Sequence, residues 1–282
     1  MFDFFANLFG YVLNIIYSLV NNYGVAIIIF TIFLKLIMLP ISLKQQKTMK
    51  KTAKMQVKVK EIQDKYSSDP TRMNQELVDL YKNENMSPFS GCLSSIVQFV
   101  IILSIFFLVS KPLTYMKHID SETISKYVKE VSEETGEVLR YEEIAIIKEK
   151  SDEDPNVDLN MNFLGLDLSD VPSQNYTDIK VFIIPVLYVI TSIASTKITT
   201  SLNKKTEDRK ITEEVHEEAK KEKEDDAMDE MNRQMNLMMP IMSVSIALIA
   251  PLGLALYWLV SNLLSIVERL IINKVSKEEG EE

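Results

Sequence analysis

Residues 23–47 read YGVAIIIFTIFLKLIMLPISLKQQK. From Val25 to Leu43 the stretch consists mainly of Ile, Leu, Phe and Val, and its length is close to the ~20 residues that a helix needs to cross a bilayer. Lys35 is the single charged residue inside this apolar run, and further lysines follow directly behind it. The stretch therefore predicts a transmembrane helix that carries a positive charge within the membrane.

The remainder of the 282-residue chain repeats this alternation of apolar runs and charged stretches. It predicts an all-α membrane protein with five transmembrane helices, an N-terminal interfacial helix and a cytoplasmic antiparallel helical hairpin. The predicted segments are 1–22 (outer interfacial amphipathic helix), 23–43 (first span), 44–90 (cytoplasmic helical hairpin), 91–110 (second span), 111–178 (extracellular acidic loop), 179–199 (third span), 200–234 (cytoplasmic charged loop), 235–250 (fourth span), 251–272 (fifth span) and 273–282 (cytoplasmic acidic tail).

The N-terminal segment has apolar residues at helical spacing, among them Phe4, Leu8, Ile15 and Leu19. This pattern favours a helix that lies in the outer membrane interface. A retained signal-anchor remnant is the alternative.

The orientation follows from the basic residues. Residues 1–24 contain no Lys or Arg, whereas lysines crowd the far side of the first span. The positive-inside rule then places the N-terminus outside and the C-terminus in the cytoplasm of a multi-pass protein.

Residues 44–90 contain two amphipathic helical stripes separated by the turn sequence Ser67–Pro70. The stripes predict two helices that pack on each other as an antiparallel hairpin. The outer face is basic and is expected to meet lipid headgroups; its lysines are Lys47, Lys50, Lys51, Lys54 and Lys58.

A lysine at the centre of a span costs about 2.5–3.5 kcal/mol on insertion scales, so Lys35 needs polar surroundings. Helical spacing predicts a polar stripe on one face of several spans, which together would line a hydrated cavity. The simpler reading of the isolated hydroxyls is that they join helices to one another. The candidate cavity residues are Lys35, Thr31, Gln98, Ser192, Ser195, Tyr257, Trp258 and Ser261.

The sequence gives little support for an enzyme active site. Cys92 is the only cysteine, the two histidines stand apart, and neither a phosphate-binding loop nor a nucleophile elbow is present. We therefore expect no enzyme, no metal site and no cofactor. The net charge of −9 also argues against a nucleic-acid partner.

Taken in order, several short motifs resemble the YidC/Oxa membrane protein insertases, in the short form found in bacteria with a single membrane. The resemblance extends over nearly the whole chain. It is carried by residues 23–28 (YGVAII) leading through Lys35 to Leu39-Pro40, by 45–49 (QQKTM), 86–94 (MSPFSGCLS), 163–168 (FLGLDL), 238–240 (MMP) and 256–262 (LYWLVSN).

The resemblance implies a five-helix core around a hydrophilic groove that is open to the cytoplasm and the lipid. Lys35 stands where the family usually has Arg, which keeps the charge but loses the planar five-donor fork. Gln98 matches a polar family position in the second span. The implied partners are nascent membrane proteins as clients, the lipid bilayer of the bacterial plasma membrane, the Sec translocon and the ribosome. The acidic tail argues against ribosome docking through that segment.

A small-solute or proton-coupled transporter that uses Lys35 as a titrating group is the alternative function. It would need a second ionisable residue inside the membrane or helices broken by an inverted repeat. The sequence offers neither, because Glu268 is expected near the cytoplasmic end of the fifth span.

Overall fold

The computed structural model describes residues 2–84, 90–136, 139–214 and 245–278. Its long helices are α1 (Phe2–Val20), α2 (Tyr23–Lys65), α3 (Pro70–Asn83), α4 (Ser90–Ser110), α8 (Ile183–Glu214) and α10 (Leu252–Glu278). Shorter elements between α4 and α8 are α5 (Pro112–Tyr115), α6 (Ser121–Thr135), α7 (Glu142–Lys150), β1 (Asn162–Phe163), β2 (Leu166–Asp167) and the 3-10 helix η1 (Ile179–Phe182).

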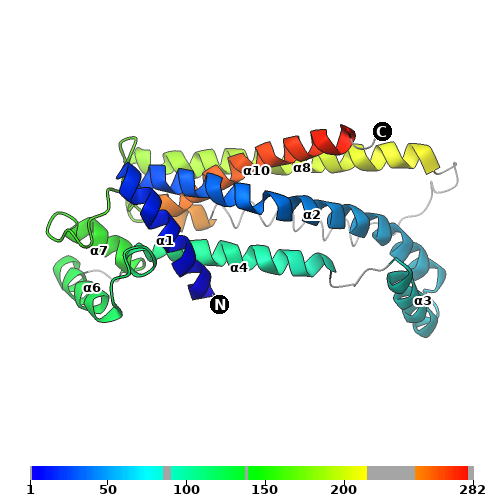
Figure 1. Cartoon of the computed structure of the whole chain (residues 1–282), viewed down its shortest axis with the longest axis horizontal. Helices are drawn as coiled ribbons and strands as arrows, with labels where there is room; N and C mark the ends of the chain where they lie inside the picture. Colours follow the sequence, from blue (N-terminus) through cyan, green and yellow to red (C-terminus); the bar gives the residue numbers. More distant parts are fainter. Residues whose placement is uncertain (1, 85–89, 137–138, 215–244, 279–282) are drawn as a thin grey trace.

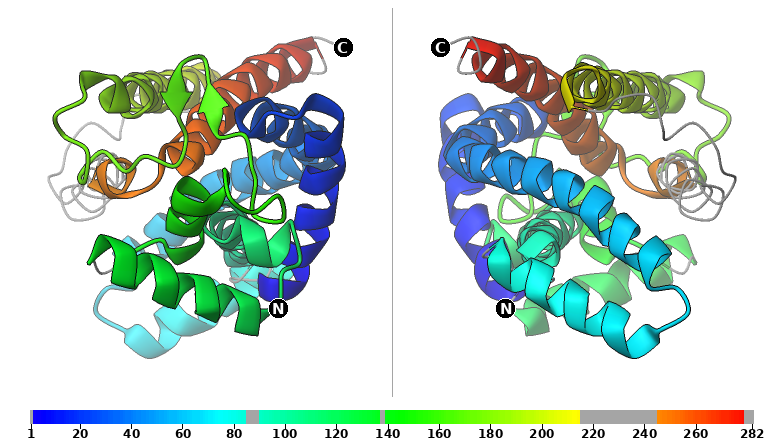
Figure 2. Two further views of the ribbon diagram at one scale, coloured as in Figure 1. Left: turned by 90° about the vertical axis from the view of Figure 1, so that its left-hand side faces the viewer. Right: turned by 90° about the vertical axis from the view of Figure 1, so that its right-hand side faces the viewer.

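The long helices α2, α4, α8 and α10 run along the long axis of the molecule, and α1 crosses α2 and α4 obliquely (Figure 1). Helix α10 packs against both α2 and α8 (Figure 2). Helix α3 lies at one end of the long axis, and α6 and α7 lie at the other. We call residues 111–178, which include α5 to β2, the cap.

Four of the described helical segments are long and apolar enough to cross a membrane: Phe2–Val20, Tyr23–Gln45, Ile179–Ile198 and Leu252–Ile272. Helix α4 coincides with the predicted second span, and its segment Phe99–Ser110 is a shorter apolar helix. Most of the predicted fourth span, 235–250, lies outside the described residues, although 245–249 are helical. The described part of the chain is thus that of an all-α membrane protein.

Helix α2 extends well beyond the predicted boundary at residue 43. It continues through Pro40 to Lys65 as one helix of 43 residues, so the first span and the first arm of the predicted hairpin form a single rod. Asp69 caps α3 by accepting a hydrogen bond from the Arg72 backbone, after which Pro70 begins the helix. Met55 on the hairpin stripe is buried.

Helix α1 has two apolar faces. The predicted stripe is exposed, with Leu19 at 81% of its full accessibility, while a second face at spacing i, i+4, i+7, i+11 is buried and consists of Ala6, Gly10, Leu13 and Tyr17. Gly10 permits this packing: a Cβ atom there would lie 1.8 Å from the carbonyl oxygen of Tyr115 in α5. The helix is therefore fixed to the cap as well as to α2 and α4.

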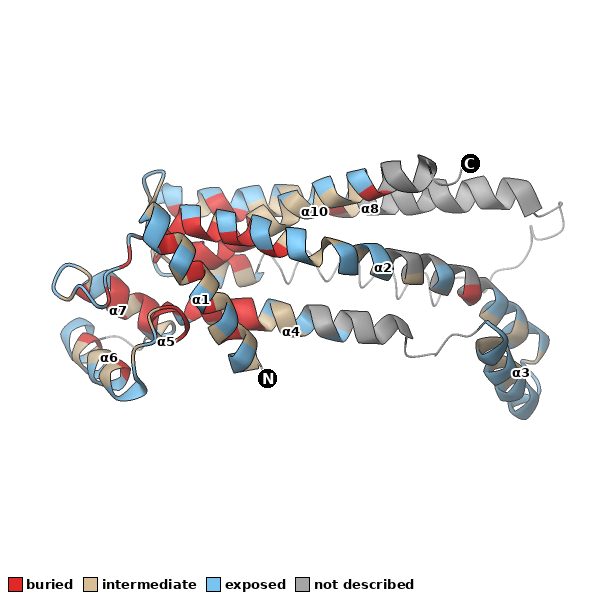
Figure 3. Cartoon of the chain, viewed as in Figure 1, coloured by how far each residue is buried: buried red, intermediate tan, exposed pale blue. Residues whose placement is uncertain are grey.

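The cap is folded around its own apolar residues, in continuity with the helix bundle. Helix α6 begins at Ser121 and buries Ile124 and Val131. Helix α7 buries Ile144, Ile146 and Ile147. Buried residues gather where the cap meets the bundle (Figure 3).

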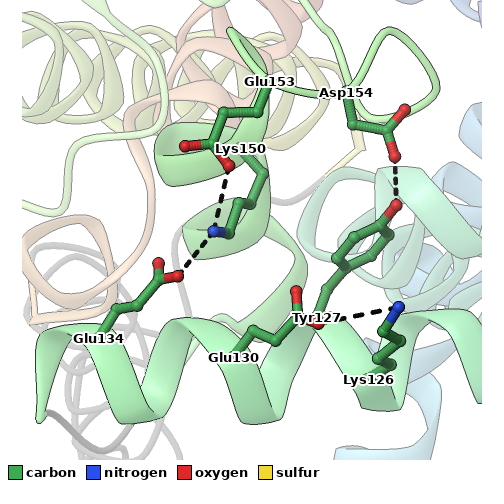
Figure 4. A network of polar contacts seen from close by, with 7 residues as sticks. All are labelled: Lys126, Tyr127, Glu130, Glu134, Lys150, Glu153 and Asp154. Carbon is green, nitrogen blue, oxygen red and sulfur yellow. Dashed lines mark hydrogen bonds and ion pairs between the residues drawn. The ribbon is translucent and has the colours of Figure 1, made fainter.

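Polar contacts also hold the cap together. Lys150 is buried and donates to Glu134 at 2.8 Å and to Glu153 at 3.2 Å, and the Tyr127 hydroxyl donates to Asp154 (Figure 4). These contacts connect α6, α7 and the turn behind α7. Three acidic residues of the predicted loop, Glu134, Glu153 and Asp154, thus help to order it.

Close contacts at two places fix the position of the cap relative to the membrane helices. The side chain of Phe163 in β1 lies against Gly24, where a Cβ atom would come within 2.5 Å of its ring. At the start of α10, the Leu252 backbone N–H donates to Asp170 and that of Gly253 to Leu168, each at 2.9 Å. The cap therefore covers the ends at which α2 and α10 begin.

Candidate functional site: an ion pair between two membrane helices

The side chain of Lys35 leaves α2 on the face that packs against α10. Its ammonium nitrogen donates a hydrogen bond to the Ser265 hydroxyl at 2.7 Å and lies 3.3 Å from Oε2 of Glu268. The side chains of Lys35 and Glu268 keep 28% and 14% of their accessible surface. The charge inside the first span therefore rests against a carboxylate and a hydroxyl from a single helix face.

The pairing gives Lys35 a carboxylate partner, Glu268, which the sequence places near the cytoplasmic end of the fifth span. Tyr23 of α2 lies beside Gly253 of α10, with a Cβ atom at Gly253 falling 3.5 Å from the Tyr23 ring. From this common level Lys35 is 12 residues along α2 and Glu268 is 15 residues along α10, a difference of about 4.5 Å in depth at 1.5 Å per residue. A lysine side chain spans that difference.

Ser261, Ser265 and Glu268 occupy one face of α10 at spacing i, i+4, i+7, as the polar stripe predicts. The Ser265 hydroxyl donates to the carbonyl oxygen of Ser261 at 2.7 Å, so its lone pairs face Lys35. Ser265 and Glu268 are not among the predicted cavity residues, although they lie on the same helix face as Ser261, which is.

Other hydroxyls of α2 and α8 bond within their own helices. Buried Thr31 donates to Ile27 at 2.6 Å, and Thr196 donates to the Ser192 carbonyl oxygen at 3.0 Å. Such bonds satisfy a hydroxyl locally without recruiting another helix. Ser195 is buried in α8, and Ser192 is half-buried beside it.

Aromatic residues join α8 to α10 next to this face. The rings of Tyr188 and Trp258 lie 5.9 Å apart, and Tyr257 is buried. Helix α10 therefore contacts α2 through the ion pair and α8 through an aromatic pair.

Some predicted residues fall outside what the structure describes. The side chain of Gln98 is among these, as are those of Lys47, Lys50 and Lys54. Lys51 and Lys58 of the predicted basic face are exposed, and Lys58 pairs with Glu84 at 2.5 Å, linking α2 to the end of α3.

The outward faces of α8 and α10 are apolar. Exposed residues recur there at helical spacing, namely Ile183, Val186, Leu187, Ile190 and Ile193 in α8 and Leu263, Val267, Leu270 and Ile271 in α10. In an aqueous protein such surfaces would be a liability, whereas in a bilayer they are the surface that lipid covers.

A second buried acid lies in the cap. Glu143 is 4% exposed and accepts hydrogen bonds from the Thr114 backbone N–H at 2.9 Å and the Thr114 hydroxyl at 2.5 Å. Burial raises the pKa of its carboxyl group, and the bonds from Thr114 offset part of this rise. Glu143 holds α7 to α5, and it belongs to the structure of the cap.

Fold and site together define a multi-pass α-helical membrane protein with an ion pair between two of its membrane helices. A family model described as "60Kd inner membrane protein" matches residues 15–279. Because this match covers nearly all of the sequence, the chain belongs to that family, which is the YidC/Oxa1 family.

Individual relatives carry the name "Membrane protein insertase YidC". That of Granulibacter bethesdensis is 41% identical over 105 residues, which is 37% of this chain and 18% of the relative. That of Caldanaerobacter subterraneus subsp. tengcongensis is 39% identical over 97 residues, 34% of this chain and 47% of the relative. That of Francisella tularensis subsp. novicida is 38% identical over 106 residues, 38% of this chain and 19% of the relative. The chain thus matches less than half the length of each.

Proposed function

We propose that this chain is a membrane protein insertase, which moves short polar tails of client proteins across the bilayer and releases their hydrophobic segments into lipid. The observation that carries the proposal is the charge of Lys35, held within the apolar part of α2 and facing α10. Family membership and the names of the relatives support the same function.

The proposed mechanism begins at the hairpin. A client segment meets the basic face of α2 and α3 at the cytoplasmic surface, where lysines such as Lys51 and Lys58 also contact anionic headgroups. We place the N-terminus outside and the C-terminus in the cytoplasm, as the basic residues predict. The cap then covers the outer end of the bundle.

The polar tail next enters the space beside Lys35, which we propose is hydrated and open to the cytoplasm. Burying polar groups without partners is costly, so a path lined by Lys35, Ser265 and Ser261 lowers the barrier to crossing. Lys35 attracts acidic residues of the tail. The groove uses no cofactor, because transfer of the client's apolar surface into lipid drives the process.

The client's hydrophobic segment leaves sideways along the apolar faces of α8 and α10. These faces present exposed Ile, Leu and Val at helical spacing, which match the surface of a transmembrane helix. Membrane potential adds a favourable contribution when an acidic tail moves outward.

One structural feature fits the transporter alternative, whereas the names of the relatives do not. Glu268 places a second ionisable group beside Lys35, but an ion pair between two helices does not by itself indicate the transport of a solute or proton. The relatives are nevertheless insertases by name, which favours insertion.

The test is reconstitution of the purified protein into liposomes with a single-span client that has an acidic N-terminal tail. Insertion predicts that the tail becomes protected from external protease in proportion to the amount of reconstituted protein. Liposomes with the same amount of heat-denatured protein are the control. A tail that stays accessible in both preparations would refute the proposed function.

A further inference from the structure

We infer that Glu268 determines how strongly the site discriminates between client tails by charge. Its carboxylate holds the Lys35 ammonium in an intramolecular ion pair that an acidic client residue must replace. The inference rests on the proposed insertase function and assigns to this site a broad class of clients, with neutral as well as acidic tails.

The ion pair between Lys35 and Glu268 is formed, and both side chains remain partly exposed. Lys35 and Glu268 come from different helices, are 3.3 Å apart, and retain 28% and 14% of their side-chain surface. Ser265 provides a second acceptor, and its own hydrogen bond to Ser261 keeps it in place. Among the residues that the structure describes, Lys35 is held by these two partners, and Glu268 is the charged one.

The charge balance of the site follows directly. With the pair intact, the formal charges of Lys35 and Glu268 sum to zero, so a neutral tail meets no net charge there. An acidic client residue that binds Lys35 forms one ion pair and breaks another, the one between Lys35 and Glu268. The net gain is small, because the two contacts are of the same kind.

Removal of the Glu268 charge should convert a weakly selective site into a selective one. Glu268→Gln keeps the shape and a hydrogen-bond acceptor but removes the negative charge that faces Lys35, so the pair position carries a net positive charge. Acidic tails then gain a full ion contact, and basic tails meet uncompensated repulsion.

The experiment measures insertion into liposomes for three clients that share one hydrophobic segment and differ only in an acidic, neutral or basic tail. We compare the wild type with Glu268→Gln, Glu268→Asp and the double variant Lys35→Gln/Glu268→Gln, per folded molecule. The matched control is Glu134→Gln, which removes the carboxylate of a lysine pair in the cap.

For Glu268→Gln, the ratio of acidic-tail to neutral-tail insertion should rise about tenfold, equivalent to about 1.4 kcal/mol. Glu268→Asp and Glu134→Gln should keep the wild-type ratio, and the double variant should insert all three tails alike. If the wild type inserts clients but Glu268→Gln leaves the ratio unchanged, the inference is wrong and the insertase function stands. If the wild type inserts no client, the proposed function fails and the inference fails with it.

Discussion

Lys35 and Glu268 are 233 residues apart in the sequence, yet the ammonium nitrogen of one lies 3.3 Å from a carboxylate oxygen of the other. The contact ties α2 to α10 at a depth where each charge alone would be costly. Breaking a fully buried pair by removing one partner typically costs about 3–5 kcal/mol, and the partial exposure of this pair reduces the figure. The same contact thus supports the bundle and places a charge where a polar tail would pass.

The packing of α1 on the cap can be tested at Gly10. Gly10→Ala should destabilise the protein by about 1–3 kcal/mol, because the new Cβ would lie 1.8 Å from the rigid backbone oxygen of Tyr115. Thermal unfolding in detergent micelles measures the effect. Gly253→Ala is the control, since its Cβ would have no neighbour closer than 3.5 Å. Equal stability of the two variants would show that α1 does not pack tightly on α5.

The buried acid of the cap predicts a pH dependence. Because the folded pKa of Glu143 is raised, the folded cap binds more protons than the unfolded chain between the ordinary pKa of 4.5 and that raised value. The contribution of Glu143 to stability is therefore present below this interval and is lost as the pH rises through it. Unfolding free energies of the wild type and Glu143→Gln, measured over this range, should differ by an amount that changes with pH. A constant difference would show that the Glu143 carboxyl keeps an ordinary pKa.

The orientation can be tested by labelling single cysteines in a Cys92→Ser background. A cysteine at Lys51 in α2 should react with a membrane-impermeant reagent only from the cytoplasmic side. A cysteine at Lys129 in α6 should react only from outside, because the cap is expected there. Both side chains are exposed, so access to the reagent is not limiting. Labelling of both positions from one side would contradict the predicted orientation.

The basic face of α2 should matter for clients and lipids more than for folding. Replacing Lys47, Lys50, Lys51, Lys54 and Lys58 by Gln should reduce insertion into anionic liposomes, since each lysine near such a surface contributes about 1 kcal/mol. The matched control changes Lys126 and Lys129 to Gln in the cap, where both are exposed. Insertion in both variants is measured at equal amounts of folded protein. An equal loss in the control would show that general surface charge is responsible.

The sequence predicts the membrane helices because long apolar runs are a local signal. Lys35 is found in the same way, since a lone charge in such a run has few structural roles. Its partner could not be located so readily, because the depth of Glu268 depends on where α10 starts. That start is fixed by backbone hydrogen bonds from Leu252 and Gly253 to the cap.

The short elements of the cap could not be predicted from the sequence. Its core is assembled from short segments, with Ile146 from α7 and Leu168 from the turn after β2. Such segments have too few residues for a clear periodicity. The tight approach of Gly10 to Tyr115 depends equally on tertiary packing.

The role of Lys35 in insertion is tested most directly by insertion per folded molecule for Lys35→Arg, Lys35→Ala and Lys35→Glu, each with an acidic-tail and a neutral-tail client. Lys35→Arg should retain activity because it keeps the charge. Lys35→Ala should lose activity mainly for the acidic tail, since Glu268 then faces the tail without its cation, and Lys35→Glu should be worst. If Lys35 were a proton carrier, Lys35→Arg would lose activity, because arginine stays protonated. Equal losses for the acidic and the neutral tail would contradict an electrostatic role for Lys35.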